Sequence, residues 1–180
     1  MKILGLDIST SITGASIIEN NKIIFSEAWD LRNKNKFADV FDKAAFIKER
    51  LIDIRATHNP QAVFIEKSLQ MFRSGFSSSK VLSTLSSFNG IVSYLCHQEL
   101  GVKPEYVSAS SARKECGIKI PRGEKAKKVV LNFLLDNEPQ FEVEYTSAGN
   151  PKPRYYDIAD SIVIARAGQK MRLNSPSGTN

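Results

Sequence analysis

A chain of 180 residues is long enough to bury the core of one ordinary domain. Lysine and arginine number 25 against 19 acidic residues, and the resulting net charge of +6 favours a polyanionic partner such as nucleic acid. The apolar runs are too short to span a membrane, the first residues do not resemble a signal peptide, and two cysteines exclude a disulfide framework, so we expect a cytoplasmic protein.

Short strands are expected at the start of the chain. Residues 2–8, 14–18 and 23–28 are rich in β-branched side chains, which favour strands. The second and third of these segments are joined through Glu19-Asn20-Asn21, and asparagine favours the tight turns of hairpins. The chain is therefore predicted to begin as an antiparallel meander.

Helical periodicity begins at Phe37. Apolar residues recur every three or four positions as far as Ile54, and the pattern stops before Asn59-Pro60. The other expected elements are a strand at 62–65, a helix with its apolar stripe at 81–95, a strand at 106–107, a helix at 122–137 and a last helix carrying residues 157 and 160. This order predicts an α/β domain over residues 1–172, with a mixed β-sheet flanked by α-helices. The polar residues 173–180 predict a flexible C-terminal tail.

Four carboxylates occupy positions that suit a shared site. Asp7 and Glu66 each follow an apolar strand, while Asp157 and Asp160 are spaced i and i+3 on one face near a helix start. If the first strand is central, all four meet at one sheet edge, where apolar surroundings make ionised groups costly without cations. Hard oxygen ligands favour Mg²⁺ or Mn²⁺, and two such ions about 3.5–4 Å apart suit phosphodiester hydrolysis. Each residue alone would be a strand end, a helix cap or a surface group.

Three segments carry a resemblance to a known family. Gly5-Leu6-Asp7 together with Gly14, the segment 63–66 and the Asp-x-x-Asp helix at 156–162 are similar to the motifs of the RuvC-type Holliday junction resolvases, in the ribonuclease H-like superfamily. The resemblance extends over nearly the whole chain. It implies a ribonuclease H-like fold and two Mg²⁺ or Mn²⁺ ions, with catalytic and metal-binding roles for Asp7, Glu66, Asp157 and Asp160.

The chain departs from the family at two points. Asp7-Ile8-Ser9-Thr10 stands where the family usually reads Asp-Pro-Gly, which indicates a divergent member of the kind that phages encode. We accordingly expect it in the cytoplasm of a bacterium or a phage-infected host. After Glu66, Leu69 stands where the family places an aromatic residue. The identity of the residue that separates bases at the branch point therefore stays open.

Candidate DNA-binding residues fall into two groups. The Gly/Ser-rich loop after Glu66 carries Phe72, Arg73 and Phe76, which suit unstacking of bases in branched DNA, although both aromatics could also pack on the core. The region 117–125 resembles the segment with which the family contacts the scissile phosphate. Basic side chains that could follow phosphates, or form a solvated surface, are Arg113, Lys114, Lys119, Arg122, Lys125, Lys127 and Lys128.

These features predict a structure-selective endonuclease that resolves four-way junctions, and other branched DNA, by symmetric nicks. A homodimer is expected, because such junctions are nearly two-fold symmetric. One alternative is a ribonuclease H-fold nuclease or binding module that acts on structured RNA. Another is a sugar-kinase or actin-like phosphotransferase, since residues 7–14 also resemble that superfamily's phosphate-binding hairpin, but 180 residues are too few for two ATP-clamping domains.

Overall fold

The computed structural model describes residues 1–67 and 79–174. Within these residues, five strands form one mixed sheet in the order β3-β2-β1-β4-β5. The first three strands are antiparallel neighbours, and β4 and β5 run parallel to the central strand β1. The strands are β1 Lys2–Asp7, β2 Ile12–Glu19, β3 Lys22–Asp30, β4 Ala62–Glu66 and β5 Glu105–Val107.

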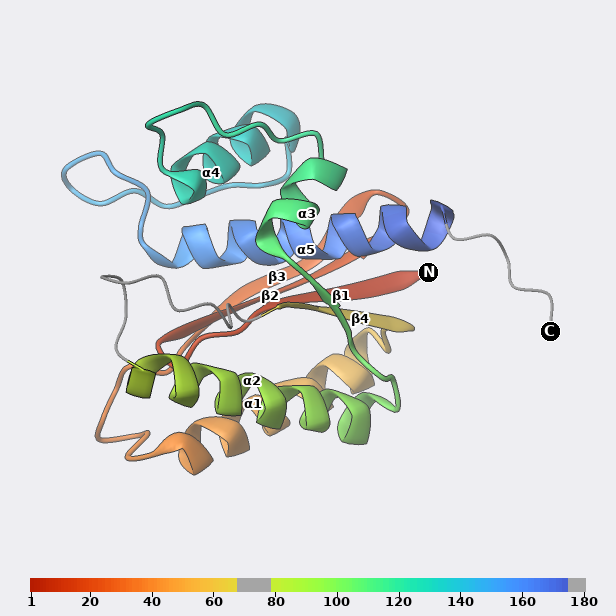
Figure 1. Cartoon of the computed structure of the whole chain (residues 1–180), viewed down its shortest axis with the longest axis vertical. Coiled ribbons are helices and arrows are strands. Elements are labelled where there is room, and N and C mark those ends of the chain that lie inside the picture. The colour runs from red at the N-terminus through yellow and green to blue at the C-terminus, as the bar shows by residue number, and fades with distance from the viewer. Residues whose placement is uncertain (68–78, 175–180) are drawn as a thin grey trace.

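Helices cover both faces of this sheet (Figure 1). One face is covered by α1 and α2, and the other by α5, on whose outer side α3 and α4 pack. The described helices are α1 Val40–Thr57, α2 Ser79–Leu100, α3 Ala109–Glu115, α4 Ala126–Asn137 and α5 Arg154–Asn174. The predicted α/β fold, with a mixed sheet flanked by helices, is confirmed.

Local sequence signals account for several element ends. The β2–β3 connection is a two-residue turn in which Asn20 and Asn21 both adopt positive φ, 51° and 61°, as the tight hairpin requires. The side chain of Asp39 accepts hydrogen bonds from the backbone amides of Phe41 and Asp42 and so caps the start of α1. Ser108 caps α3 by accepting from the backbone amide of Ser111.

The two faces of the sheet bury separate cores. Alternate residues of β1 point to opposite sides, so that Leu4 and Leu6 pack against α1 and α2 while Ile3 packs beneath α5. On the first side the core is filled by large side chains, including Ile47 of α1 and Phe88 of α2, which are fully buried. Both cores lie along the central strand, and both therefore fix the position of its carboxyl end.

Glycines let α5 lie unusually close to the sheet. A Cβ atom added to Gly5 would lie within 3.0 Å of the backbone oxygen of Ser161, and one added to Gly14 would lie within 3.0 Å of that of Asp157. Real Cβ atoms essentially never make such contacts. The hydroxyl oxygens of Ser16 on β2 and Ser161 on α5 are 2.6 Å apart in the same buried seam. This seam sets the height and register of the first turns of α5 above β1 and β2.

Four details differ from the sequence expectations. The helix expected at 122–137 begins at Ala126, because Gly123 adopts a φ of 88° in the preceding turn, and the short helix α3 was not predicted. Phe41, one of the apolar residues in the repeat expected from Phe37 to Ile54, is 71% exposed because it lies on the outer side of α1. The last helix continues to Asn174, two residues into the expected tail, and 175–180 lie outside the described residues.

In the part of the chain that the structure describes, none of the helices combines the length and the apolar character needed to cross a bilayer.

Candidate active site

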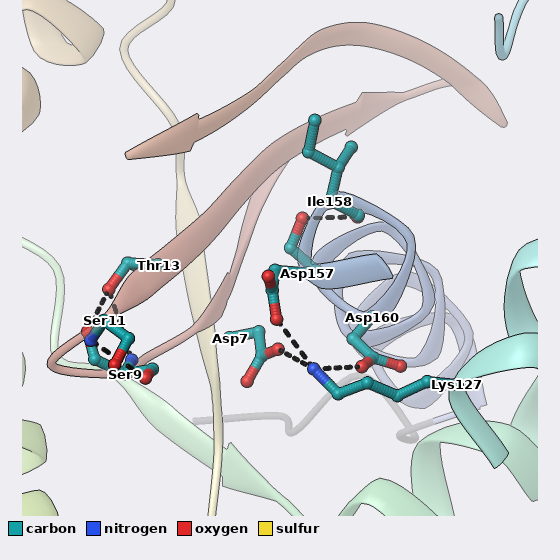
Figure 2. A network of polar contacts seen from close by, with 9 residues as sticks. Asp7, Ser9, Ser11, Thr13, Lys127, Asp157, Ile158 and Asp160 are labelled. Carbon is teal, nitrogen blue, oxygen red and sulfur yellow. Dashed lines mark hydrogen bonds and ion pairs between the residues drawn. The ribbon is translucent and has the colours of Figure 1, made fainter. Parts of the chain in front are cut away.

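Four carboxylates meet at the carboxyl ends of β1 and β4. Asp7 is the last residue of β1 and Glu66 the last of β4, and the parallel pairing of Leu6 with Ile65 makes these two ends neighbours. Asp157 lies in the first turn of α5, and Asp160 follows one turn later. Figure 2 shows Asp7, Asp157 and Asp160 directed toward one point between the sheet and the helix. The convergence expected from strand ends and from the i, i+3 spacing is therefore observed.

A lysine ammonium lies at that point. Lys127 Nζ is 2.7 Å from Asp157 Oδ1, 3.4 Å from Asp160 Oδ2 and 3.9 Å from Asp7 Oδ2 (Figure 2). Lys127 is the second residue of α4, and Lys125 is the N-cap of that helix. From the sequence, Lys127 is predicted to contact DNA phosphates, and no contact with the carboxylates is expected. Which lysine of α4 points toward the carboxylates depends on where the helix begins. The sequence predicts a start at residue 122, about four residues before the observed start at Ala126.

Burial and mutual repulsion raise the pKa values of Asp7, Glu66 and Asp160. Desolvation, followed by the charges of Glu66 and Asp160, raises the pKa of Asp7 well above its ordinary value. Desolvation and the charge of Asp160 raise the pKa of Glu66 to about 7. Desolvation likewise raises the pKa of Asp160, and the charge of Lys127 opposes the increase in all three groups. The site therefore favours the binding of a proton or of another positive charge.

Burial alone would lower the pKa of Lys127, but its acidic neighbours outweigh that effect. The charge of Asp7 and the hydrogen bond to Asp157 are the largest opposing contributions, and the pKa of Lys127 is raised overall. The ammonium is thus held in its charged form among the carboxylates. It acts as a built-in cation at the centre of the site.

The donor set fits a hard divalent cation. Carboxylate oxygens are the ligands that Mg²⁺ and Mn²⁺ prefer, and these come from the ends of strands and from a helix that glycines seat firmly on the sheet. In the observed arrangement of residues 1–67 and 79–174, no three acidic, histidine or cysteine side chains are already spaced to hold a metal ion. Binding of a cation therefore requires the carboxylates to close in on it. The expectation of two Mg²⁺ or Mn²⁺ ions stays a prediction.

The chain after Asp7 forms a self-bonded turn. Thr13 Oγ1 accepts from the backbone amide of Ser9 and donates to the Ser9 carbonyl, and Ser9 Oγ accepts from the amide of Ser11 (Figure 2). From α1, Lys43 Nζ donates to the carbonyl of Thr10 at 2.7 Å. These bonds engage the hydroxyls of Ser9 and Thr13 within the turn itself. The turn braces the end of β1.

Glu66 is also supported from the α2 side. The side-chain amide of Asn89, a buried residue of α2, donates to the backbone carbonyl of Glu66 at 3.2 Å. The backbone amide of Lys67 donates to the carbonyl of Val107 on β5. Sequence reasoning did not find Asn89, since a polar residue within a helical stripe gives no signal of what it contacts across the core.

A basic groove lies beside the carboxylates. Arg113, Lys114 and Lys119, together with Gly117, line a cavity of about 320 Å³ at the carboxyl end of α3. The charge of Arg113 lowers the pKa values of Glu66 and Asp160, so this side chain lies close to the acidic site. Three of the predicted DNA-binding residues therefore share one cavity, and Arg113 among them lies near the carboxylates.

The remaining predicted DNA-binding residues are placed elsewhere or not at all. Arg122 and Lys125 are exposed in and just after the loop that precedes α4, and Lys128 is exposed in the first turn of that helix. Phe72, Arg73 and Phe76 lie outside the described residues, so their expected contact with unpaired bases stays a prediction.

Comparison with known proteins finds similarity in structure. No family model and no curated protein matches the sequence. Thermus thermophilus RuvC in complex with a Holliday junction substrate is similar with a TM-score of 0.67 at 16% identity, over 97% of each chain. The Thermus thermophilus RuvC structure gives 0.64 at 15% identity, over 97% of this chain and 98% of that one. The yeast mitochondrial Holliday junction resolvase Ydc2 gives 0.62 at 16% identity, over 95% of this chain and 78% of that one. The chain has the RuvC-like ribonuclease H fold, so the predicted resemblance is confirmed at the level of the fold.

Proposed function

We propose that this protein is a metal-dependent endonuclease that nicks branched DNA, with the four-way junction as its principal substrate. The observation that carries the proposal is the convergence of Asp7, Glu66, Asp157 and Asp160 at one end of a RuvC-like sheet. Hydrolysis of a phosphodiester by carboxylate-bound divalent ions requires clustered acidic ligands on rigid elements and no side-chain nucleophile. This site offers that set of groups.

The four carboxylates would bind two Mg²⁺ or Mn²⁺ ions. When bound, such ions lower the pKa of a water for attack on phosphorus and stabilise the leaving oxygen. The chain's own contribution is to position the ligands: β1 and β4 fix Asp7 and Glu66, and the glycine-lined seam fixes Asp157 and Asp160. Repulsion among these partly buried carboxylates supplies the affinity for added positive charge.

The basic groove would hold the DNA backbone beside the carboxylates. Arg113 is best placed for the phosphate nearest the site, because its charge already acts on Glu66 and Asp160. Lys114 and Lys119 extend the positive surface, and Arg122, Lys125 and Lys128 continue it around the start of α4. Bending of the DNA at the branch point would bring these separate basic patches into contact with different arms.

A homodimer would present two such sites to opposed strands of a junction. The exposed side of α2 carries the small residues Ser83, Ser87 and Gly90 at helical spacing, which would allow another helix to approach closely. Sedimentation of the purified protein tests this part of the proposal. A dimer that Gly90→Glu converts to a monomer would support an α2 interface, and a wild-type monomer at micromolar concentration would contradict it.

Cleavage of synthetic substrates tests the proposal as a whole. A labelled four-way DNA junction is incubated with Mg²⁺, Mn²⁺ or EDTA beside duplex, flap and four-way RNA substrates, with wild type, Asp160→Asn and the control Asp136→Asn, which alters an exposed carboxylate on α4. We expect paired nicks on opposed DNA strands that require metal and are lost only with Asp160→Asn. Cleavage confined to the RNA junction would favour the structured-RNA alternative, and EDTA-resistant cleavage would contradict the metal site.

A further inference from the structure

The Lys127 ammonium contacts carboxylates from two separate parts of the fold. It is 3.9 Å or less from an oxygen of Asp7 on β1 and of Asp157 and Asp160 on α5. Those three side chains are only 14–16% exposed, so their charges are poorly screened by water. Lys127 is therefore a strong local counter-charge and not a loosely associated surface lysine.

The same oxygens are those that the proposed metal ions would need. Mg²⁺ binds carboxylate oxygens at about 2.0–2.1 Å and demands near-octahedral geometry around itself. The Lys127 ammonium is 2.7 Å from Asp157 Oδ1. It occupies the space that an ion would need, and its N–H groups use the oxygen lone pairs that would otherwise bind the ion. An ammonium and a divalent ion in one poorly solvated cluster would also repel each other strongly.

The Lys127 side chain has more freedom to move than any other part of the site. Lys127 lies in the first turn of α4, whose N-cap residue Lys125 makes no side-chain capping bond, and 55% of its side chain is exposed. A change of rotamer can carry the flexible stem toward solvent without unfolding the helix. The backbone that carries Asp157 and Asp160 is pressed against Gly5 and Gly14, so these shorter side chains adjust to an ion only by rotating about their own bonds.

We infer that Lys127 competes with the divalent cation for the carboxylates of Asp7, Asp157 and Asp160, so that a metal ion binds only when the ammonium leaves. This inference rests on the proposed metal-dependent function. It adds that the position of the Lys127 side chain controls whether a metal ion can bind. Lys127 holds the cluster together without metal and lowers its apparent affinity for metal. Removal of the ammonium should therefore tighten binding of the ion.

Titration with Mn²⁺ in the absence of DNA tests the competition. Affinity is measured by calorimetry or electron paramagnetic resonance at pH 8.5 for wild type, Lys127→Met, which keeps an apolar stem without the charge, and Lys128→Met, which alters the exposed neighbour. We expect Lys127→Met to bind Mn²⁺ about tenfold more tightly than wild type, within the usual range of coupling between ligands. Lys128→Met should match wild type. Equal or weaker binding by Lys127→Met would overturn the inference.

Two further proteins keep the test decisive. If Lys127→Met does not fold, as judged by circular dichroism, Lys127→Gln replaces it with a polar side chain of similar reach. Asp160→Asn separates the two proposals, since it should abolish the Mn²⁺ signal if this cluster is the metal site. A wild-type signal that survives Asp160→Asn would overturn both, whereas a signal lost in Asp160→Asn but unchanged by Lys127→Met would overturn the competition alone.

Discussion

The two faces of the central sheet are packed in different ways. Beneath α1 and α2 the sheet presents large side chains such as Leu4 and Leu6, which meet fully buried residues such as Ile47. Beneath α5 it presents Gly5 and Gly14, and the backbone of the helix takes the space that side chains would fill. The first face is a conventional hydrophobic interface, whereas the second combines a side-chain core, which includes Ile3 and Phe64, with a close backbone contact at Gly5 and Gly14.

The two kinds of packing differ in how firmly they hold the helices that lie on them. Side-chain packing tolerates small rearrangements, because rotamers can adjust to a change in volume. Backbone contact allows no such adjustment, and the first turns of α5 carry Asp157 and Asp160 against Asp7. We conclude that the α1/α2 face supplies mainly stability, while the α5 face also sets the geometry of the candidate site.

The largest effect that follows from this comparison is expected from Gly14→Ala. Its methyl group would collide with the backbone oxygen of Asp157, so the start of α5 must shift away from the sheet. A displacement of about 1 Å at a catalytic group can cost on the order of 10²-fold in rate, and we expect a loss of that size in junction cleavage. The measurement is single-turnover cleavage per folded molecule, with folding followed by circular dichroism. A variant that folds and cleaves like wild type would show that the seam does not set the site.

Ile47→Ala is the matched change on the other face. Ile47 is completely buried between α1 and the sheet, and truncation of such a residue costs about 2–5 kcal/mol of stability. Cleavage per folded molecule should stay within about twofold of wild type, a change worth less than 1 kcal/mol. Urea unfolding measures the first quantity and cleavage below the transition measures the second. If the rate falls as far as in Gly14→Ala, the two faces do not divide stability from geometry.

A smaller effect, on stability as a function of pH, is expected from replacing Glu66 in the carboxylate cluster. The pKa of Glu66 is about 7 in the folded protein against an ordinary value of 4.5, so between these values the folded state binds the proton more tightly than the unfolded state. Ionisation therefore costs stability as the pH rises from about 4.5 to about 7. In EDTA, Glu66→Gln should gain stability relative to wild type across this range and keep a constant advantage above it. Thermal unfolding at several pH values measures this difference.

The exposed Glu49 on α1 supplies the control for that experiment. Glu49→Gln removes the charge of an exposed carboxylate that lies outside the cluster, and it should follow the wild-type pH dependence. The opposite result for Glu66→Gln, a stability that falls relative to wild type as the pH rises, would mean that Glu66 is stabilised in its ionised form. Repulsion among the carboxylates would then not be the source of affinity for a cation.

Parts of the fold and of the candidate site could be predicted from the sequence. Strand runs, the hairpin at Asn20 and Asn21 and the spacing of Asp157 and Asp160 are local signals, and each gave the correct element or face. A central first strand would place the strands that end in Asp7 and Glu66 side by side, and the structure shows this pairing. Gly14 was recognised through the resemblance, but its contact with the backbone of Asp157 is a long-range feature that no local pattern encodes.

Other parts depend on tertiary structure and were missed. A seven-residue helix such as α3 spans two turns, too few for an apolar period to emerge, so the grouping of Arg113 with the carboxylates could not be foreseen. The role of Lys127 depends on which residue begins α4. Phe41 fits the apolar spacing of α1 yet is exposed, since periodicity alone does not fix how far a buried face extends around a helix.

The smallest expected effect concerns the serine pair in the α5 seam. Ser161 Oγ donates to the carbonyl of Ile158 at 2.7 Å, so in the 2.6 Å contact between the two hydroxyls Ser16 is the donor. Ser161→Ala removes the acceptor of a buried Ser16 hydroxyl and should cost about 1–3 kcal/mol, whereas Ser16→Ala leaves Ser161 bonded to Ile158 and should cost less. The double variant should cost less than the sum of the two, because removal of both partners leaves no unpaired hydroxyl. Urea unfolding of the three proteins measures this order, and equal costs for the two single variants would mean that the donor direction is not fixed in the seam.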